Sequence, residues 1–152
     1  MARKKLETKI SIRSMVEEDL QGVLAIDRAT SGGKRVLTYA DPVENYTGGD
    51  VNMSWVAEVG DTIVGFVLSR LAEPAPGMPK VAWIELVGVD PDQQHRGIGG
   101  RLVEALSEQC KKLGVSRVHV MSDRNDEVMK SFFSSLGFKQ GNLINYYRRV
   151  EE

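Results

Sequence analysis

The feature that most constrains the fold is a strand–turn–helix unit in the middle of the chain. The apolar run Val81–Val89 predicts a buried strand, and the apolar spacing of Leu102–Leu113 predicts a helix. Between them lies the glycine-rich turn Gly97–Gly100, at the point where the helix begins. A helix N-terminus leaves about four backbone N–H groups unpaired, and glycine lets the backbone approach an anion closely. The unit therefore predicts a phosphate-binding turn, with Arg96 and Arg101 adding positive charge.

Shorter strands and helices on both sides of this unit predict a mixed α/β fold whose sheet is largely antiparallel at the start. The boundaries are 1–8 for a flexible N-terminal segment and 9–152 for a single domain, in which residues 30–50 form a surface excursion or a substrate-facing loop. The other expected elements are strands over Ile10–Arg13, Met53–Val59, Thr62–Arg70 and Arg117–Ser122, a helix capped by Ser14 and Glu17 that runs to about Ala29, a helix over Asp126–Leu136, and a closing hairpin of Phe138–Gln140 with Ile144–Val150.

Composition excludes several classes of protein. The formal net charge is -1, which gives no electrostatic case for binding nucleic acid or an anionic membrane. No window approaches the ~20 apolar residues that a membrane helix needs. The lone cysteine, Cys110, excludes an internal disulfide and a multi-cysteine metal site, so no metal is expected. A cytoplasmic protein is the expectation, since no apolar run follows the basic N-terminus as in a signal peptide.

Two nucleotide-binding motifs fail to match the glycine-rich turn. A P-loop needs Gly-Lys followed by Ser or Thr, which the chain lacks. A Rossmann fingerprint needs a third glycine and a place in the first strand–helix unit, whereas several strands are expected before Gly97. Both folds are therefore disfavoured.

Two blocks carry a resemblance to a known family. Val89–Leu102 resembles the acetyl-CoA pyrophosphate signature of the GNAT superfamily of N-acetyltransferases, Gln/Arg-x-x-Gly-x-Gly/Ala. A second block, from Asn125 through Ser131–Phe138, resembles the family segment Asn-…-Tyr-x-x-x-Gly-Phe. The resemblance implies a GNAT-like acyl-CoA N-acyltransferase fold, in which two central parallel strands splay apart, with acetyl-CoA as the cofactor.

The resemblance also implies roles for the matching residues. Backbone N–H groups from Arg96 to Arg101 would hold the pyrophosphate, and pantetheine would pair with the backbone of the strand that ends at Val89. Asn125 would lie near the thiol end. The residues assigned in this way to the cofactor are Val87, Val89, Gln94, His95, Arg96, Gly97, Ile98, Gly99, Gly100, Arg101, Asn125 and Phe133.

The chain departs from the family pattern where the family has a tyrosine that protonates the leaving thiolate. Phe133 occupies that position and cannot donate a proton, and Asn125 falls one residue out of register. The acid is then displaced, supplied by water or unnecessary, since a thiol of pKa ~8.5 leaves readily as its thiolate. Tyr146 and Tyr147 alternate along the expected closing hairpin, so one should face inward and either could supply the acid.

The candidate base is Glu85, the only carboxylate within the Val81–Val89 strand. A charge in so apolar a run is costly unless it faces a cleft or has a partner. Glu85 is therefore expected either to take a proton from the acceptor amine or to form a structural ion pair. His119, in the middle of a strand, is a second candidate base, although a histidine there is ordinarily structural.

The sequence thus predicts an N-acetyltransferase that transfers an acetyl group from acetyl-CoA to a primary amine by direct attack in a ternary complex. The acceptor could be a peptide or protein N-terminus, a lysine or a small-molecule amine, and the closing hairpin leaves a homodimer open. The alternative is a catalytically silent acyl-CoA-binding or regulatory module on the same fold, which Phe133 favours.

Overall fold

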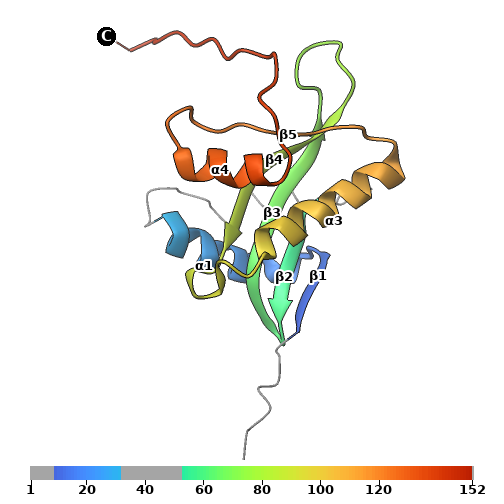
Figure 1. Cartoon of the computed structure of the whole chain (residues 1–152), viewed down its shortest axis with the longest axis vertical. Coiled ribbons are helices and arrows are strands. Elements are labelled where there is room, and N and C mark those ends of the chain that lie inside the picture. The colour runs from blue at the N-terminus through green and yellow to red at the C-terminus, as the bar shows by residue number, and fades with distance from the viewer. Residues whose placement is uncertain (1–8, 32–52, 152) are drawn as a thin grey trace, which may run out of the picture. The chain divides into compact units, whose positions relative to one another are not determined.

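The computed structural model describes residues 9–31 and 53–151 (Figure 1). The chain divides into two compact units, Met1–Met121 and Ser122–Glu152, and each is described by itself. The segment predicted to be flexible, residues 1–8, lies outside the described residues, as does most of the stretch predicted to be a loop, from residue 32 to 50.

The first unit is built on a five-stranded sheet in which each strand lies beside the next one along the chain. The first three pairings are antiparallel and the last is parallel, which confirms the predicted mixed α/β architecture. The strands are β1 (Ile10–Ser14), β2 (Trp55–Val59), β3 (Thr62–Ala72), β4 (Val81–Val89) and β5 (Val118–Val120).

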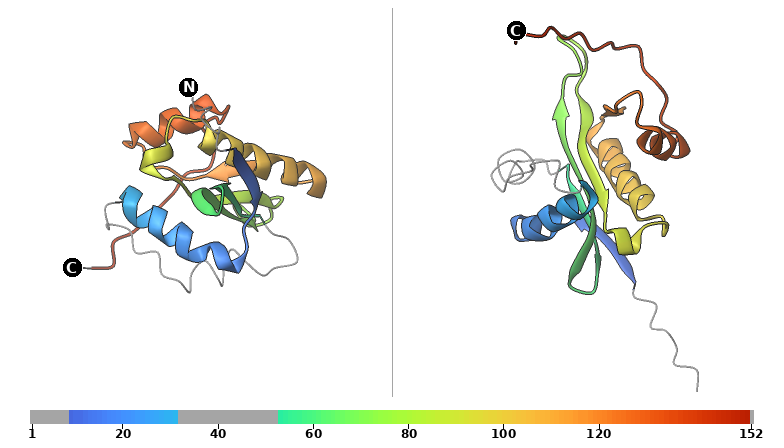
Figure 2. Two further views of the ribbon diagram at one scale, coloured as in Figure 1. Left: turned by 90° about the horizontal axis from the view of Figure 1, so that it is seen from below. Right: turned by 90° about the vertical axis from the view of Figure 1, so that its left-hand side faces the viewer.

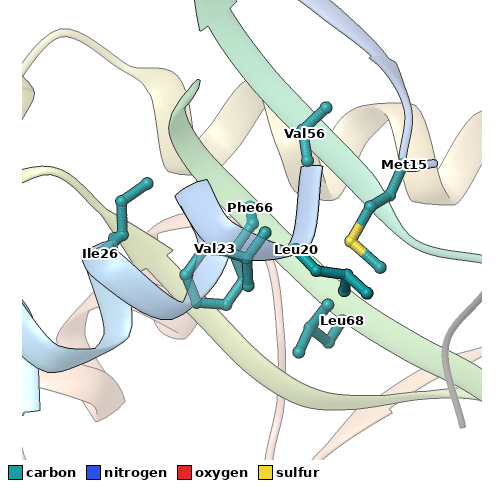
Figure 3. Packing of buried hydrophobic residues seen from close by; sticks show 7 residues of the cluster. All are labelled: Met15, Leu20, Val23, Ile26, Val56, Phe66 and Leu68. Carbon is teal, nitrogen blue, oxygen red and sulfur yellow. The ribbon is translucent and has the colours of Figure 1, made fainter. Parts of the chain in front are cut away.

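Helices cover both faces of this sheet. A short 3-10 turn, η1 (Glu17–Asp19), leads into α1 (Leu20–Ser31) on one face, and α3 (Ile98–Leu113) lies on the other (Figure 2). Side chains of α1, β2 and β3 meet in the core beneath α1 (Figure 3). The members of this core cluster are Met15, Leu20, Val23, Ile26, Val56, Phe66 and Leu68.

A glycine on β3 allows α3 to pack closely against the sheet at its N-terminal end. A Cβ built on Gly65 would lie 2.9 Å from Ile98 Cγ2 and 3.2 Å from Leu102 Cδ1. Those distances are shorter than ordinary van der Waals contact, so a larger residue would push the first turn of α3 away. Gly65 therefore helps to set the distance between the sheet and the start of α3.

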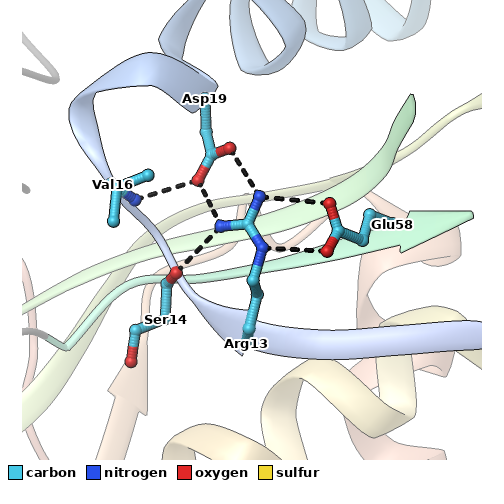
Figure 4. Close-up of polar contacts among 5 residues, drawn as sticks. All are labelled: Arg13, Ser14, Val16, Asp19 and Glu58. Carbon is cyan, nitrogen blue, oxygen red and sulfur yellow. Dashed lines mark hydrogen bonds and ion pairs between the residues drawn. The ribbon is translucent and has the colours of Figure 1, made fainter. Parts of the chain in front are cut away.

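Arg13 joins β1, β2 and η1 through two carboxylates (Figure 4). Its guanidinium donates to both oxygens of Asp19, each at 2.8 Å, and to Glu58 at 3.0 and 3.1 Å. Asp19 also accepts from the backbone N–H of Val16 at 2.9 Å. The predicted cap of Ser14 and Glu17 is therefore wrong: Ser14 ends β1, and Asp19 pairs with the backbone where the chain turns.

The second unit contains α4 (Glu127–Ser135), close to the predicted bounds. The Asp126 side chain caps it by accepting from Met129 N at 3.1 Å, and Gly137 follows with φ 88°. The predicted closing hairpin is wrong, because the described residues from 138 to 151 contain no strand. An alternating pattern forms a strand only where a second strand completes its hydrogen bonds, and such a partner is not visible in a pattern.

The Arg13 network predicts a pH-dependent contribution to stability. Burial raises the pKa of Asp19, but the hydrogen bonds from Arg13 and Val16 outweigh it and hold this pKa below its ordinary value. A lowered pKa stabilises the folded state above the unfolded pKa of about 3.9, and the contribution is lost as pH falls through the folded pKa. Asp19→Asn should therefore reduce the free energy of unfolding at pH 7 by about 1–3 kcal/mol, with the difference shrinking below about pH 3.9.

Urea unfolding of the two proteins at pH 7 and pH 3 would measure this difference. Glu108→Gln is the matched control, because Glu108 also pairs with a cation, Lys111, but both side chains are exposed. The control should leave stability almost unchanged at either pH. An equal loss in both variants would contradict the role given to the Arg13 network.

Candidate active site

The parallel strands β4 and β5 pair over only a short distance. Their register joins Ala82 to Val118, Trp83 to His119 and Ile84 to Val120. β4 continues to Val89, so its last residues have no strand partner on the β5 side among the described residues. We call this side of Glu85–Val89 the free edge of β4.

The backbone of Val87 and Val89 is directed toward the free edge. On the other side β4 pairs with β3, and Asp90 N donates to Val64 O at 2.8 Å. Because hydrogen-bonded residues alternate along an antiparallel ladder, Val87 and Val89 direct their N–H and C=O groups away from β3. The Gln94 side chain, 3.4 Å from Val89 O, reaches one of these carbonyls. The structure thus places Val87, Val89 and Gln94 at this edge.

The turn after β4 ends in backbone N–H groups that have no acceptor among the described residues. A short 3-10 turn, η2 (Pro91–Gln93), leads into a segment in which His95 and Gly97 are left-handed, with φ 65° and 75°. The first helical bond of α3 joins Arg101 N to Gly97 O at 3.1 Å. No acceptor among the described residues lies against the N–H groups at positions 98–100. This turn is therefore a set of free donors at the positive end of a helix.

The left-handed conformation of His95 was not predicted from the sequence. A positive φ is uncommon for a residue with a Cβ and costs free energy, so such residues concentrate at functional sites. The residue type does not predict a positive φ at this position, because histidine is common in ordinary loops. The conformation follows from the path that the chain takes between η2 and α3.

The two arginines of the turn have hydrogen-bond partners within the chain. Arg96 donates to Gln93, and Arg101 Nη1 donates to Ile10 O on β1 at 3.2 Å. Ile98 is 2 % exposed and packs toward Gly65. Ile98 would therefore contribute only its backbone N–H to an anion, while Gly99 is buried and Gly100 partly so.

Glu85 lies at an irregularity in β4 and has a partner. The β3–β4 register shifts between Leu68 and Ser69, which leaves Glu85 without an opposite residue, as in a β-bulge. Its Oε1 lies 2.7 Å from Arg70 Nε, and its side chain is 29% exposed. The ion pair expected as one solution for this charge is present, and Glu85 also adjoins the free edge.

His119 stacks on the indole of Trp83, with ring centroids 6.1 Å apart and an interplanar angle of 28°. Trp83 and Arg70 were not singled out from the sequence. Arg70 could have been found, because it is the only charged residue of β3. The structure therefore groups Arg70, Trp83, Glu85 and His119 on neighbouring strands.

The remaining predicted residues lie in the second unit. Asn125 is exposed in the turn before α4, and its N–H donates to Asp123 Oδ1 at 2.7 Å. Phe133 is buried, with edge contacts to Phe132 and Phe138 at centroid distances of 5.0 and 5.1 Å. Tyr146 and Tyr147 are 87% and 83% exposed, so the prediction that one faces inward is wrong. Without the predicted hairpin, no strand pairing directs either tyrosine side chain toward a core.

Neither a metal centre nor a membrane-spanning helix is found among the described residues. Over 9–31 and 53–151, no three residues of His, Cys, Asp or Glu are grouped so as to hold a metal ion. No helix in these ranges has the length and apolar character required to cross a membrane.

The chain is similar in sequence to known acetyltransferases. The chain is 35% identical over 112 residues to the N-alpha-acetyltransferase RimI of Mycobacterium tuberculosis, a match that covers 73% of this chain and 62% of that protein. It is 27% identical over 88 residues to a mycothiol acetyltransferase of Kocuria rhizophila, covering 58% of this chain and 29% of that enzyme. The chain thus spans less than two thirds of the length of these relatives.

Solved structures show the same fold at low identity. The aminoglycoside N-acetyltransferase AAC(6')-Iy in complex with CoA superposes with a TM-score of 0.79 at 17% identity, over 93% of this chain and 95% of that one. The model of the acetyltransferase (GNAT) family matches residues 23–138, which include β4, the glycine-rich turn and α4. The chain therefore belongs to the GNAT family of acetyltransferases.

Proposed function

We propose that this chain is an N-acetyltransferase that transfers an acetyl group from acetyl-CoA to a primary amine by direct attack in a ternary complex. The observation that carries the proposal is the free edge of β4 followed directly by the free N–H groups at the start of α3. The relatives support an amine acceptor, since they include an N-alpha-acetyltransferase and a [Ribosomal protein bS18]-alanine N-acetyltransferase of Escherichia coli, 32% identical over 62 residues.

The residues present fit acetyl-CoA. Pantetheine is a chain with two amides, which the outward-directed backbone of Val87 and Val89 would pair with as a further strand does. A pyrophosphate needs several N–H donors and a positive field, which the first turn of α3 offers. A Cβ built on Gly97 would have no other heavy atom within 4 Å, so the space beside the turn is open.

Acetyl transfer to an amine requires few side chains. Acetyl-CoA supplies the acetyl group as a thioester when it is bound. Glu85 takes a proton from the acceptor ammonium, directly or through water, which frees the nitrogen lone pair for attack. Backbone N–H groups on the free edge stabilise the negative charge that develops on the carbonyl oxygen. Collapse of the tetrahedral adduct would break the C–S bond, and water would take the second proton that the nitrogen loses. The thiolate would leave without being protonated, so Phe133 need not supply an acid.

A catalytically silent acyl-CoA-binding module is the second candidate. Phe133 favours it, because a buried phenylalanine replaces the family's tyrosine and both Tyr146 and Tyr147 are exposed. Such a module would bind acetyl-CoA with the same residues but release no free CoA with any amine.

The turn is tested by comparing two glycines of the same helix. Gly97 and Gly114 precede and follow α3, have φ of 75° and 71°, and would each carry a Cβ into open space. Either substitution by alanine should cost about 1 kcal/mol through the left-handed backbone. Only Gly97→Ala should also weaken acetyl-CoA binding, by about tenfold or more, since its methyl group meets the pyrophosphate. Calorimetric titration with acetyl-CoA measures both variants, and equal affinities would refute the assignment.

The base is tested with Glu85→Gln, which keeps the shape and removes the basicity. We expect kcat/KM to fall by about 10²–10⁴-fold, with acetyl-CoA affinity nearly unchanged. Glu73→Gln, an exposed carboxylate just after β3, is the control and should leave turnover unchanged. A lower Tm with normal turnover per folded molecule would instead make Glu85 a structural ion-pair partner, and would leave His119 or a backbone-held water as the base.

A further inference from the structure

Three side chains of different chemistry lie in one row across the sheet. The register places Arg70 of β3 opposite Trp83 of β4, and Trp83 opposite His119 of β5. Residues directly opposite in neighbouring strands project from the same face, and the Trp83–His119 stacking agrees with this. We call this set the Arg70–His119 row.

The row lies on the face of the sheet that α1 covers. Phe66, Leu68 and Arg70 alternate along β3 and so share one face, and the first two belong to the core cluster under α1. Leu68 is the last β3 residue of that cluster. Arg70 is the next β3 residue on the same face, and its side chain is 48% exposed. The side chains therefore change from apolar to charged and aromatic at the row.

Arg70 has hydrogen-bond donors that are not used by the described residues. Its Nε donates to Glu85, but Nη1 and Nη2 have no hydrogen-bond partner among the described residues. The guanidinium presents these groups as a rigid fork that matches a carboxylate bidentately. Glu85, at 2.7 Å from Nε, places a negative charge directly beside that fork.

We propose that the row is the acceptor subsite and that it selects an α-amino acid with a planar side chain, an inference that rests on the proposed function. The acceptor ammonium would pair with Glu85 and its carboxylate with the free Nη groups of Arg70. The two charges of an α-amino acid are one carbon apart, which suits two protein charges in direct contact. The planar side chain would lie over Trp83, flanked by His119.

The same charges disfavour other amines. A peptide N-terminus has a neutral amide where the amino acid has its carboxylate, so it leaves the Arg70 fork without an anion. A polyamine brings further positive charge against Arg70, which costs free energy at short range. The row therefore distinguishes this chain's acceptor from the protein α-amine in the name of its RimI relative.

The test compares amines that differ only in the predicted features. Release of free CoA is measured with L-phenylalanine, L-phenylalanine amide, phenethylamine and L-alanine. We expect kcat/KM for L-phenylalanine to exceed those for the amide and phenethylamine by about 10- to 100-fold, because a charge-assisted hydrogen-bond pair is lost. L-alanine should be poorer than L-phenylalanine, since it lacks the planar group. Equal or better turnover of the amide would overturn the proposal.

A substitution of Arg70 tests whether this residue causes the preference for the amino acid over its amide. In Arg70→Gln the ratio of kcat/KM for acid over amide should fall to about one. Lys112→Gln removes the same charge from an exposed site in the last turn of α3 and should keep the full ratio. A ratio unchanged in Arg70→Gln would overturn the proposal, and because it is a ratio, partial loss of folded protein does not affect it.

Equilibrium binding separates failure of this inference from failure of the proposed function. Calorimetric titration of L-phenylalanine and of its amide into the full chain with CoA requires no turnover. Tighter binding of the acid, lost in Arg70→Gln, supports the subsite even if no amine is acetylated, which would leave the silent module. Equal binding of acid and amide would refute the subsite, whereas acetylation of any amine would still support the transferase.

Discussion

The end of strand pairing between β4 and β5 is the constraint on which the rest of the site depends. Pairing stops at Ile84 and Val120, while β4 runs on to Val89 with its other edge held by β3. Backbone N–H and C=O groups need partners, so a free edge inside a sheet calls for something strand-like to complete it. The bulge at Glu85 lies at this same point, so the free backbone and the one carboxylate of the strand adjoin each other.

The sheet holds this edge in place from both faces. The core cluster under α1 packs against β2 and β3, and Gly65 lets the start of α3 approach β3 on the opposite face. Arg13 ties β1 and β2 to the turn that leads into α1. These contacts lie within the chain itself and hold the donors at the turn in a fixed arrangement, which lowers the entropic cost of binding an anion.

The charges around β4 divide the proposed work between backbone and side chains. The backbone of Val87, Val89 and the turn is suited to a cofactor whose recognition needs only amides and phosphates. Glu85 and Arg70, in contrast, form a pair of opposite charges at 2.7 Å that suits a zwitterion. Such a division would let one family keep its backbone site while acceptors change with a few side chains, which agrees with the different acceptors in the names of the sequence relatives.

Several features were determined by the sequence itself, because they depend on local chemistry. The glycine-rich turn at 97–100 predicted where α3 begins, the apolar run predicted β4, and the spacing in Val89–Leu102 predicted the turn and the family. Only the tertiary structure decided what depends on partners far along the chain. It paired Glu85 with Arg70, placed His119 on Trp83, gave His95 its left-handed backbone and formed no strand where the closing hairpin was expected. Helix ends and turns are set by neighbouring residues, whereas ion pairs, bulges and strand pairing require two segments to meet, and a sequence pattern describes only one of them.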